Sequence, residues 1–424
     1  MNYFLLSLEL FMYVFAVYIA FRKKELAIIY LPVIFFANTV IGEHFASAFI
    51  YYGIITMVLL YILRQNESFV KSNVFSILLI IYFAVLMGRS ANLVNIRQDL
   101  FNVMWLFFCI PVIPVLYKKY SRETVMKELG SSSLIILLIF ILNAGLSTVF
   151  RYDVYSMYGI TSGVIYGNMF ATDFNILAIA IFLVFMRALN SKNLLFLVVG
   201  IAAIALLCLT MRRSVIGLAF FGVAIVMLLF FIQNIKNALV FGVLIMAAAV
   251  FIIAKTDFVP SFNDRYELRH LDERALEEEK RLFEFDLIYN DVFVHHRYSA
   301  WFGFGLFNSS GNYGDGTFYD RSLHSDMTSI MHSGGLIGLT LYLLMMLSAF
   351  LTAMRRATGF RDRLVVMFCA AVFVTFALTG RFTQVGCMLL LMLALNIPVS
   401  VPEYEMEEEE ETEELPEQGS LSVS

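Results

Sequence analysis

Apolar runs with few or no charged residues follow one another along almost the whole chain. Each run is close to the length of about twenty residues that an α-helix needs to cross the hydrocarbon of a membrane. The runs lie near residues 3–21, 26–42, 45–63, 74–88, 100–117, 132–150, 168–187, 193–210, 214–232, 238–254, 334–353, 364–380 and 384–401. Three of them, 74–88, 168–187 and 384–401, are short or mixed, and one of these could be re-entrant. The pattern predicts an all-α polytopic membrane protein with 12–13 transmembrane helices.

One long polar segment, 255–333, interrupts this pattern. It separates N-terminal helices over 1–254 from C-terminal helices over 334–401, and a tail over 402–424 follows. Within the segment, a charged stretch compatible with a helix precedes the amphipathic sequence RLFEFDLIYNDVFV. Glycines among aromatic residues come next, and we expect them to mark turns and close backbone approaches. These glycines are Gly303, Gly305, Gly311, Gly314 and Gly316.

The composition excludes an ordinary soluble protein. Hydrophobic residues make up 60% of the chain, charged residues make up 15%, and the mean hydropathy is +0.78. Soluble domains contain about 45–50% apolar and about 25% charged residues. All four cysteines lie inside apolar runs, so we interpret them as small buried hydrophobic residues and not as disulfide or metal sites. No basic segment precedes the first run and no small-residue cleavage site follows it, so we expect a retained helix there.

The net charge of −4 combines two regions of opposite sign. Ten glutamates lie in Glu403–Glu417, which leaves 24 acidic and 30 basic residues, or +6, for the rest of the chain. The glutamate-rich segment has no apolar period, so we expect it to be disordered. Its simplest interpretation is a solvated terminal segment, and the functional alternative is a docking tail for a basic partner.

Basic residues are distributed unequally between the two sides of the predicted bundle. The short loops of one side hold sixteen: Arg22, Lys23, Lys24, Arg64, Lys71, Lys118, Lys119, Arg122, Lys127, Arg187, Lys192, Lys236, Arg355, Arg356, Arg361 and Arg363. The short loops of the other side hold six: Arg89, Arg97, Arg151, Arg212, Arg213 and Arg381. Because cytoplasmic loops are enriched in Lys and Arg, the first side is predicted to be cytoplasmic. The N-terminus and the 255–333 loop are then outside, and the acidic tail is inside.

The type of basic residue also differs between the two sides. All six bases of the short outer loops are arginines, whereas eight of the ten lysines are cytoplasmic. The rigid guanidinium fork suits bidentate binding of phosphate oxygens, while lysine is sufficient beside anionic lipid. The arginines therefore indicate an anionic ligand at the outer face, and Arg89 and Arg151 are candidate ligands on this argument. The alternative is that these side chains are interfacial anchors at helix ends.

The end of the loop contains residues that could carry out chemistry. His324 lies where the loop re-enters the membrane, beside Asp326. An imidazole at the mouth of a helix bundle can act as a general base near neutral pH, although an interfacial histidine is more often structural. Trp301 and its aromatic neighbours have flat faces that suit the apolar side of a sugar ring. Such faces also suit a loop that lies at a membrane interface.

The pattern His324-Ser325, nine residues, then Gly335-Leu-Ile-Gly338 resembles the signature of the O-antigen polymerase and O-antigen ligase superfamily. The two glycines are one helical turn apart, so we expect another helix to approach closely at this point.

Two further features support this resemblance. The segment Leu209–Ser214 lies where family members carry a Thr-x-Ser-Arg turn between two helices, and Arg213 is the matching arginine. Arg281 opens the amphipathic run that leads to the Gly-x-Gly turn after Trp301, as in the family, although the usual proline is missing. Together the matches span about residues 205–345, and the hydropathy profile extends the likeness over the whole chain.

The resemblance implies a metal-independent membrane glycosyltransferase with a GT-C-type fold and no cofactor. Such enzymes transfer a glycan from undecaprenyl pyrophosphate to a hydroxyl acceptor on the outer side of the bacterial inner membrane. His324 is then the general base, and Arg213 and Arg281 stabilise the departing pyrophosphate as charge develops on it. The expected substrate-binding residues are Arg212, Arg297, Trp301, Asp326, Arg89 and Arg151.

The expected activity is polymerisation, in which the acceptor is another lipid-linked repeat unit. A ligase, which transfers the glycan to the lipid A core, stays open as an alternative. The expected partners are the undecaprenyl-linked donor and acceptor, membrane lipid and a chain-length regulator protein, and no nucleic acid. A transporter is the alternative of another class, but transporters tend to carry mid-membrane ionisable residues and broken helices in two matching halves. The sequence offers little of either.

Overall fold

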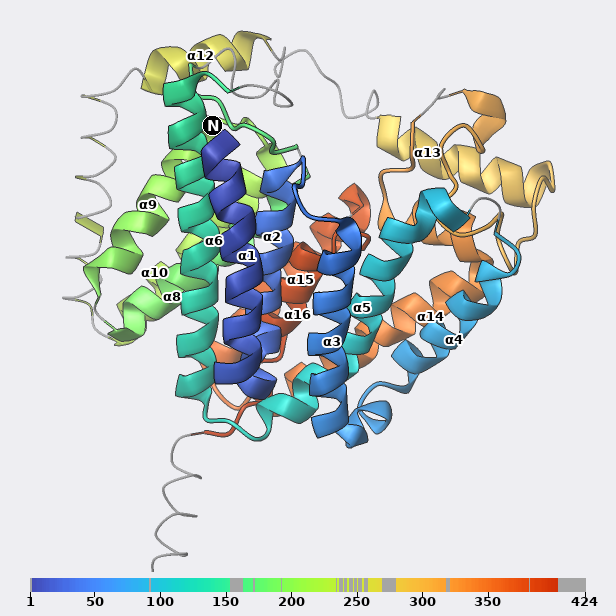
Figure 1. Ribbon diagram of the computed structural model, residues 1–424, viewed down its shortest axis with the longest axis horizontal. Coiled ribbons are helices and arrows are strands. Elements are labelled where there is room, and N and C mark those ends of the chain that lie inside the picture. Colours follow the sequence, from blue (N-terminus) through green and yellow to red (C-terminus); the bar gives the residue numbers. More distant parts are fainter. Residues whose placement is uncertain are drawn as a thin grey trace, which may run out of the picture.

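The computed structural model of the chain describes most of residues 2–402 (Figure 1). The positions outside this description are 1, 91–92, 153–162, 171, 192, most of 234–257, 269–279, 318–320, 381 and 403–424. Among the described residues, helices are the only regular secondary structure. The all-α class predicted from the sequence is therefore confirmed. The acidic tail, which the sequence predicts to be disordered, lies outside the described residues.

Eight helical spans are long and apolar enough to cross a membrane. They are Asn2–Arg22 (α1), Lys24–Ile41 (η1, Lys24–Tyr30, then α2, Leu31–Ile41), Ala48–Gln65 (α3), Leu93–Tyr117 (α5), Arg122–Phe150 (α6), Arg213–Gln233 (α10), Asp326–Arg356 (α14) and Phe360–Thr379 (α15). Four shorter apolar helices accompany them: Val74–Met87 (α4), Asn175–Ser191 (α8), Leu194–Cys208 (α9) and Val385–Leu395 (α16). The chain is thus a multi-pass membrane protein. The remaining predicted run, 238–254, lies mostly outside the described residues.

Short polar residues at the ends of the apolar runs begin several of these helices. The side chains of Ser47, Asn73, Ser121 and Asn193 each accept a hydrogen bond from a backbone N–H in the first turn of the following helix. The first four N–H groups of a helix have no partner within it, so an oxygen at this position stabilises the helix. Helix boundaries in this chain are therefore set by caps as well as by the loss of apolar character.

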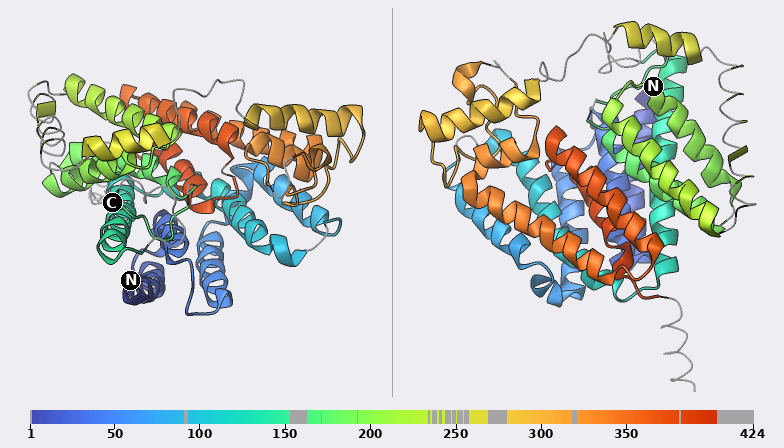
Figure 2. Two further views of the ribbon diagram at one scale, coloured as in Figure 1. Left: turned by 90° about the horizontal axis from the view of Figure 1, so that it is seen from above. Right: turned by 180° about the vertical axis from the view of Figure 1, so that it is seen from behind.

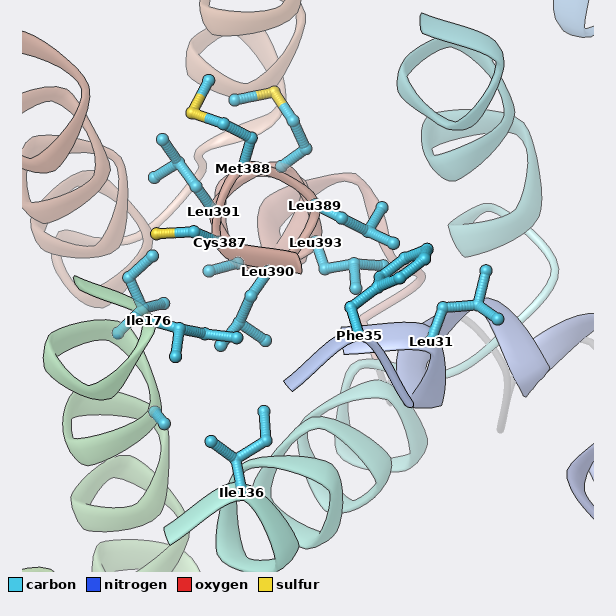
Figure 3. Close-up of a cluster of buried hydrophobic side chains, with 14 of the residues drawn as sticks. Leu31, Phe35, Ile136, Ile176, Cys387, Met388, Leu389, Leu390, Leu391 and Leu393 are labelled. Carbon is cyan, nitrogen blue, oxygen red and sulfur yellow. The ribbon is translucent and has the colours of Figure 1, made fainter. Parts of the chain in front are cut away.

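Helix α16 is the centre of the hydrophobic core. Every residue in 387–395 is buried, and Figure 3 shows this helix against Phe35 of α2, Ile136 of α6 and Ile176 of α8. A helix that is apolar on all sides is normally surrounded by others. α16 therefore joins the N-terminal and C-terminal parts of the chain in one core.

The two ends of the bundle can be told apart by their connections. Val401, where the tail begins, exchanges backbone hydrogen bonds with Tyr120 and Arg122 between α5 and α6 (3.1 and 2.9 Å). We call this end, which also carries Lys23 and Lys119, the tail end. The opposite end, which carries the start of α1 and helices α12 and α13, is the loop end (Figure 1). Lys23 and Lys119 belong to the short loops of the side with sixteen basic residues, so this side corresponds to the tail end.

Helix α14 begins earlier than the apolar pattern predicts. The pattern ends the loop at 333 and starts the helix at 334, but the helix begins at Asp326, after the capping residue Ser325. At Gly335 the backbone leaves helical geometry (φ 62°, ψ −162°), so a break divides α14 into two segments. The first segment carries the polar residues that the pattern assigns to the loop.

The loop itself contains helices, as its sequence predicts. α12 (Phe258–Leu268) lies in the charged stretch, and α13 (Lys280–Tyr289) with the π-helical turn η4 (Asn290–Val294) forms the amphipathic run. The two views of Figure 2 show α13 beside α14, next to the end of α4. The five glycines that were expected to mark turns all have φ angles in the left-handed region, between 58° and 147°.

A second, smaller hydrophobic cluster fixes the C-terminal part of the loop to the bundle. Its buried members come from α13, η4, the turns and α14, and they are Ile288, Val292, Tyr313, Leu323 and Met331. Burial of these apolar side chains stabilises the packed arrangement. This part of the loop is therefore a folded unit that can position side chains for chemistry.

Candidate active site

His324 lies two residues before α14, and several contacts fix its backbone. Its N–H donates to Oε2 of Glu284 (2.8 Å). Its carbonyl oxygen lies so close to Gly380 that a Cβ at this glycine would overlap it, and Gly380 has a φ of 72° that favours glycine. The neighbouring Ser325 donates to the carbonyl of Ala377 in α15 (2.8 Å). His324 is therefore held between α13 and the end of α15.

The imidazole of His324 faces a buried carboxylate. Glu284 of α13 has no exposed surface, and its Oε1 lies 3.1 Å from Nδ1 of His324 and 2.9 Å from Nη2 of Arg321. Nε of Arg321 also lies 3.1 Å from Nδ1 of His324. A buried carboxylate requires a charged partner or hydrogen-bond donors, and Arg321 and the His324 N–H supply both. We call Glu284, Arg321 and His324 the loop-end cluster.

The second side of the imidazole is open, since 39% of the His324 side chain is exposed. A neutral imidazole carries a proton on one nitrogen and a lone pair on the other. When Nδ1–H donates to Glu284, the lone pair lies on Nε2. When Nδ1 instead accepts from Arg321, the proton lies on Nε2. The carboxylate favours the first tautomer, in which Nε2 can take a proton from a hydroxyl group as a general base must, whereas the Arg321 Nε–H favours the second.

A turn of the loop fills the break in α14. The N–H of Leu336 donates to the carbonyl of Ala300 (2.8 Å), and the N–H of Phe304 donates to the carbonyl of His332 (2.7 Å). The hydroxyl of Tyr82 in α4 donates to the carbonyl of Gly334 (2.6 Å). These bonds satisfy backbone groups that the break leaves without helical partners. They also lock the loop to both α4 and α14.

The glycines of the Gly-x-x-Gly pattern have different neighbours from those expected. A Cβ on Gly335 would overlap the backbone of Trp301 and Gly303, so this glycine admits the loop and not another helix. Gly338 does face a helix, because a Cβ there would lie 3.3 Å from the ring of Tyr82 in α4. The expected helix approach therefore holds for only one of the two glycines, because the break turns the other toward the loop.

Exposed aromatic side chains of the same turn lie beside a predicted arginine. Trp301, Phe302 and Phe304 expose 61%, 41% and 42% of their surface. The guanidinium carbon of Arg89, after α4, lies 4.9 Å from the centre of the Phe302 ring, which is a cation–π contact. The structure thus brings Arg89 and the Trp301 segment to one surface at the loop end.

Two predicted substrate ligands form contacts inside the protein instead. Arg297 pairs with Asp291 (3.2 Å) and with Asp315, and its hydrogen bond with Asp315 raises the pKa of the Arg297 guanidinium. Asp326 is fully buried, and it accepts hydrogen bonds from the N–H of Phe382 (3.0 Å) and the hydroxyl of Tyr342 (3.4 Å). These contacts fasten the loop and the α15–α16 connection. Both charged groups are therefore used in contacts within the protein and not in binding a ligand.

Arg213 is exposed at the first residue of α10, which packs against α15. The rings of Phe221 and Phe368 mark this contact, with centroids 6.3 Å apart. At 1.5 Å per residue, Arg213 lies about 12 Å above Phe221, and Gly380 lies about 18 Å above Phe368. Arg213 and the contact between Gly380 and His324 are therefore on neighbouring helices at the loop end.

The other predicted arginines differ in position. Arg281 is in the first turn of α13, three residues before Glu284, and its side chain lies outside the described residues. Arg212 is half-buried in the turn before α10. Arg151 is exposed where α6 ends, and Figures 1 and 2 show α6 and α13 on opposite sides of the bundle. Arg151 is therefore not brought together with His324.

Sequence reasoning missed Glu284 and Arg321. A signal for Glu284 was present, because it precedes Ile288 and Val292 by four and eight residues, and all three are buried. These positions form the apolar stripe of the amphipathic run. A carboxylate in such a stripe indicates a buried partner. Arg321 follows a series of polar turns, and its position carries no comparable signal.

No protein-family model matches the chain, and the comparison with curated proteins gives no match.

Proposed function

We propose that the chain is a membrane glycosyltransferase of the O-antigen polymerase type. It joins oligosaccharide repeat units linked to undecaprenyl pyrophosphate, on the outer side of the bacterial inner membrane. The observation that carries this proposal is the half-exposed imidazole of His324, with Nδ1 against the buried carboxylate of Glu284 at the mouth of an apolar bundle. An orienting carboxylate of this kind holds a general-base histidine in its active tautomer.

In the proposed reaction, the acceptor hydroxyl oxygen attacks the anomeric carbon of the donor glycan. Nε2 of His324 takes the hydroxyl proton, and the new carbon–oxygen bond forms. The bond between the anomeric carbon and the pyrophosphate oxygen breaks, and its electron pair leaves with the lipid pyrophosphate. Attack from the side opposite the leaving group inverts the anomeric configuration.

Arg213 and Arg281 stabilise the leaving group. Arg213 is exposed at the N-terminus of α10, where the helix dipole and free N–H groups also attract anions. Arg281 is the second residue of α13, the helix that carries Glu284. Charge stabilisation at the leaving oxygen lowers the barrier because the charge is greater in the transition state than in the bound donor.

The distribution of basic residues supports the proposed orientation. Lys23, Lys119 and Arg122 are at the tail end, where they pair with Glu128, Glu25 and Asp362. Lysine and arginine in short loops favour the cytoplasmic side. The loop-end cluster then faces outward, where a lipid-linked glycan is exposed after it has crossed the membrane.

The proposal is tested with the full chain reconstituted in proteoliposomes together with purified lipid-linked repeat units. A ladder of products longer by whole repeats supports the polymerase. Product formed only when lipid A core is added would identify the ligase instead. Glycan that crosses the bilayer without a new glycosidic bond would identify a transporter and would refute the proposed chemistry.

A further inference from the structure

A cavity of about 250 Å³ lies between α2, α3, α5 and the start of α16. Polar side chains from three of these elements meet in it, including Asn38 of α2, Gln98, Asp99 and Asn102 of α5, and Gln384 before α16. The positions 98, 99 and 102 lie on one face of α5, because residues three and four apart share a face of a helix. Its described lining contains no member of the loop-end cluster and none of the arginines expected to bind substrate.

The cavity lies beside the N-terminus of α16, which is a short helix. Its eleven residues span about 16 Å, roughly half of the 30 Å thickness of a membrane core. α16 is followed by η6 (Ile397–Val399) and Val401 at the tail end, so its N-terminus stops well before the loop end. The connection that includes Gly380, Phe382, Thr383 and Gln384 crosses the remaining depth, and the cavity lies beside it.

The polar groups of the cavity are not used by the fold. Within the described part of the chain, the side chains of Asn38, Gln98, Asp99, Asn102 and Gln384 form no hydrogen bond with the protein. Other ionisable residues of the bundle differ in this respect, since Glu9 accepts from the N–H groups of Phe45 and Ala46. Gln98 is exposed and the other four side chains are partly exposed, so their polar groups are available to a polar ligand in the cavity.

The lining also restricts the ligand's charge. It includes the carboxylates of Asp99 and Asp173, and none of its described members is lysine, arginine or histidine. A phosphate or carboxylate ligand would be repelled by these two carboxylates, and Arg97, which acts on Tyr52, is exposed and lies outside the lining. The aromatic side chains of Tyr51, Tyr52 and Phe35 complete the wall. Carboxamides, a carboxylate and aromatic rings together match the hydroxyl rim and the apolar face of a pyranose.

We propose that this cavity binds a neutral sugar unit of the acceptor glycan. This assignment of the acceptor rests on the proposed glycosyl transfer. The donor must bring its pyrophosphate to the reacting carbon, so it requires cations. The acceptor presents a hydroxyl from its non-reducing end, far from its own pyrophosphate, so a cavity that repels anions suits it.

The cavity is connected directly to the loop-end cluster. Gly380 lies against the carbonyl of His324, and the N–H of Phe382 donates to Asp326 (3.0 Å). Gln384, only two residues later and at most about 7 Å along the chain, lines the cavity. A sugar bound there is therefore held by the same connection that positions His324.

The chain offers a built-in reporter for this cavity. It has two tryptophans, and Trp105 lies against three cavity-lining rings, with centroid distances of 6.0 Å to Phe35, 6.3 Å to Tyr51 and 5.5 Å to Tyr52. Trp301 is exposed in the loop. Trp301→Phe in the full chain therefore leaves Trp105 as the only tryptophan, and its fluorescence reports on the cavity.

The probe is the free oligosaccharide released by mild acid from lipid-linked repeat units that accumulate in a strain without this protein. We expect a saturable change in Trp105 fluorescence with the oligosaccharide and none with inorganic pyrophosphate. Asn102→Leu should weaken oligosaccharide binding at least tenfold, and Gln384→Ala, on a different element, should weaken it as well. Asn95→Leu is the matched control, because Asn95 is an exposed residue of the same helix outside the cavity.

Binding by Asn102→Leu and Gln384→Ala equal to that of the control, or a response to pyrophosphate alone, would overturn the proposal. Failure of the proposed function is distinguishable, because the assay needs no turnover. Oligosaccharide binding in a protein that forms no glycosidic bond would retain the sugar site and refute the transfer.

Discussion

Two buried glutamates, one at each end of the bundle, are held by similar contacts but face different surroundings. At the tail end, Glu128 pairs with Lys23 (2.7 Å) and accepts a hydrogen bond from Tyr30. At the loop end, Glu284 pairs with Arg321 (2.9 Å) and with His324 (3.1 Å). Each carboxylate thus has one permanent cation and one further partner.

The two carboxylates differ in this further partner, which is Tyr30 at the tail end and His324 at the loop end. Tyr30 is buried, so the tail-end cluster of Glu128, Lys23 and Tyr30 joins helices and presents no reactive group. His324 is 39% exposed, so its imidazole is accessible to a substrate hydroxyl group. We infer that a buried carboxylate is a structural device in the first case and a positioning device in the second. The following variants test this distinction.

The largest effect is expected for His324→Ala. Loss of a positioned general base typically lowers the rate by about 10²–10⁴-fold, and the arginines should still bind the donor. The measurement is turnover of lipid-linked repeat units, together with donor binding. His295→Ala is the matched control, because His295 is an exposed histidine of the same loop. Equal turnover in the two variants would make His324 structural.

Glu284→Gln should follow, with a loss of roughly 10²-fold in turnover. The amide can donate to Nδ1, which puts the imidazole proton on Nε2, the nitrogen that must accept. Glu128→Gln makes the same chemical change at the tail end. It should keep turnover near that of the parent and lower stability by about 1–3 kcal/mol, measured by thermal unfolding in detergent. The proposed difference between the two glutamates is wrong if both variants lower turnover, or if both lower only the stability.

Arg213→Lys should cause a smaller loss, roughly tenfold, because lysine keeps the charge but lacks the bidentate fork. The protein should reach the membrane at its normal level, as measured by immunoblotting. Turnover equal to that of the parent would reduce Arg213 to an interfacial anchor. Arg281 would then be the next arginine to test.

The smallest effect is expected for Arg151→Lys. Arg151 is exposed at the end of α6, on the side of the bundle away from α13, so turnover should stay within about twofold of the parent, as for most exposed positions. A loss as large as that in Arg213→Lys would show that the arginines act as one set. The conclusion that Arg151 lies apart from the site around His324 would then be wrong.

The sequence predicted much of the helical architecture because apolar runs of membrane length have few other stable structures. It missed the first segment of α14, where Asp326 and His332 interrupt the apolar pattern. Both residues are buried all the same, because Asp326 binds the N–H of Phe382 and His332 lies close to the carbonyl of Asn312 (3.1 Å). Apolar periodicity cannot anticipate buried polar residues that make tertiary contacts of this kind.

The candidate site was predictable only in part, for a related reason. His324 and the turn glycines have local patterns. Glu284, however, is forty residues away from His324 along the chain, and only the packing of α13 on α14 brings the two together. Arg297 and Asp326 were expected to bind substrate, but their charges are used inside the protein. Sequence alone does not distinguish these two uses of a charge.

Chemical rescue is the most direct test of His324 as the general base. Imidazole added to the His324→Ala variant should restore turnover of lipid-linked repeat units, in proportion to the neutral fraction of imidazole at each pH. It should not restore turnover in Arg213→Lys, where the base is intact. Absence of rescue in a His324→Ala protein that is folded and still binds the donor would contradict the account. Rescue of both variants alike would contradict it as well.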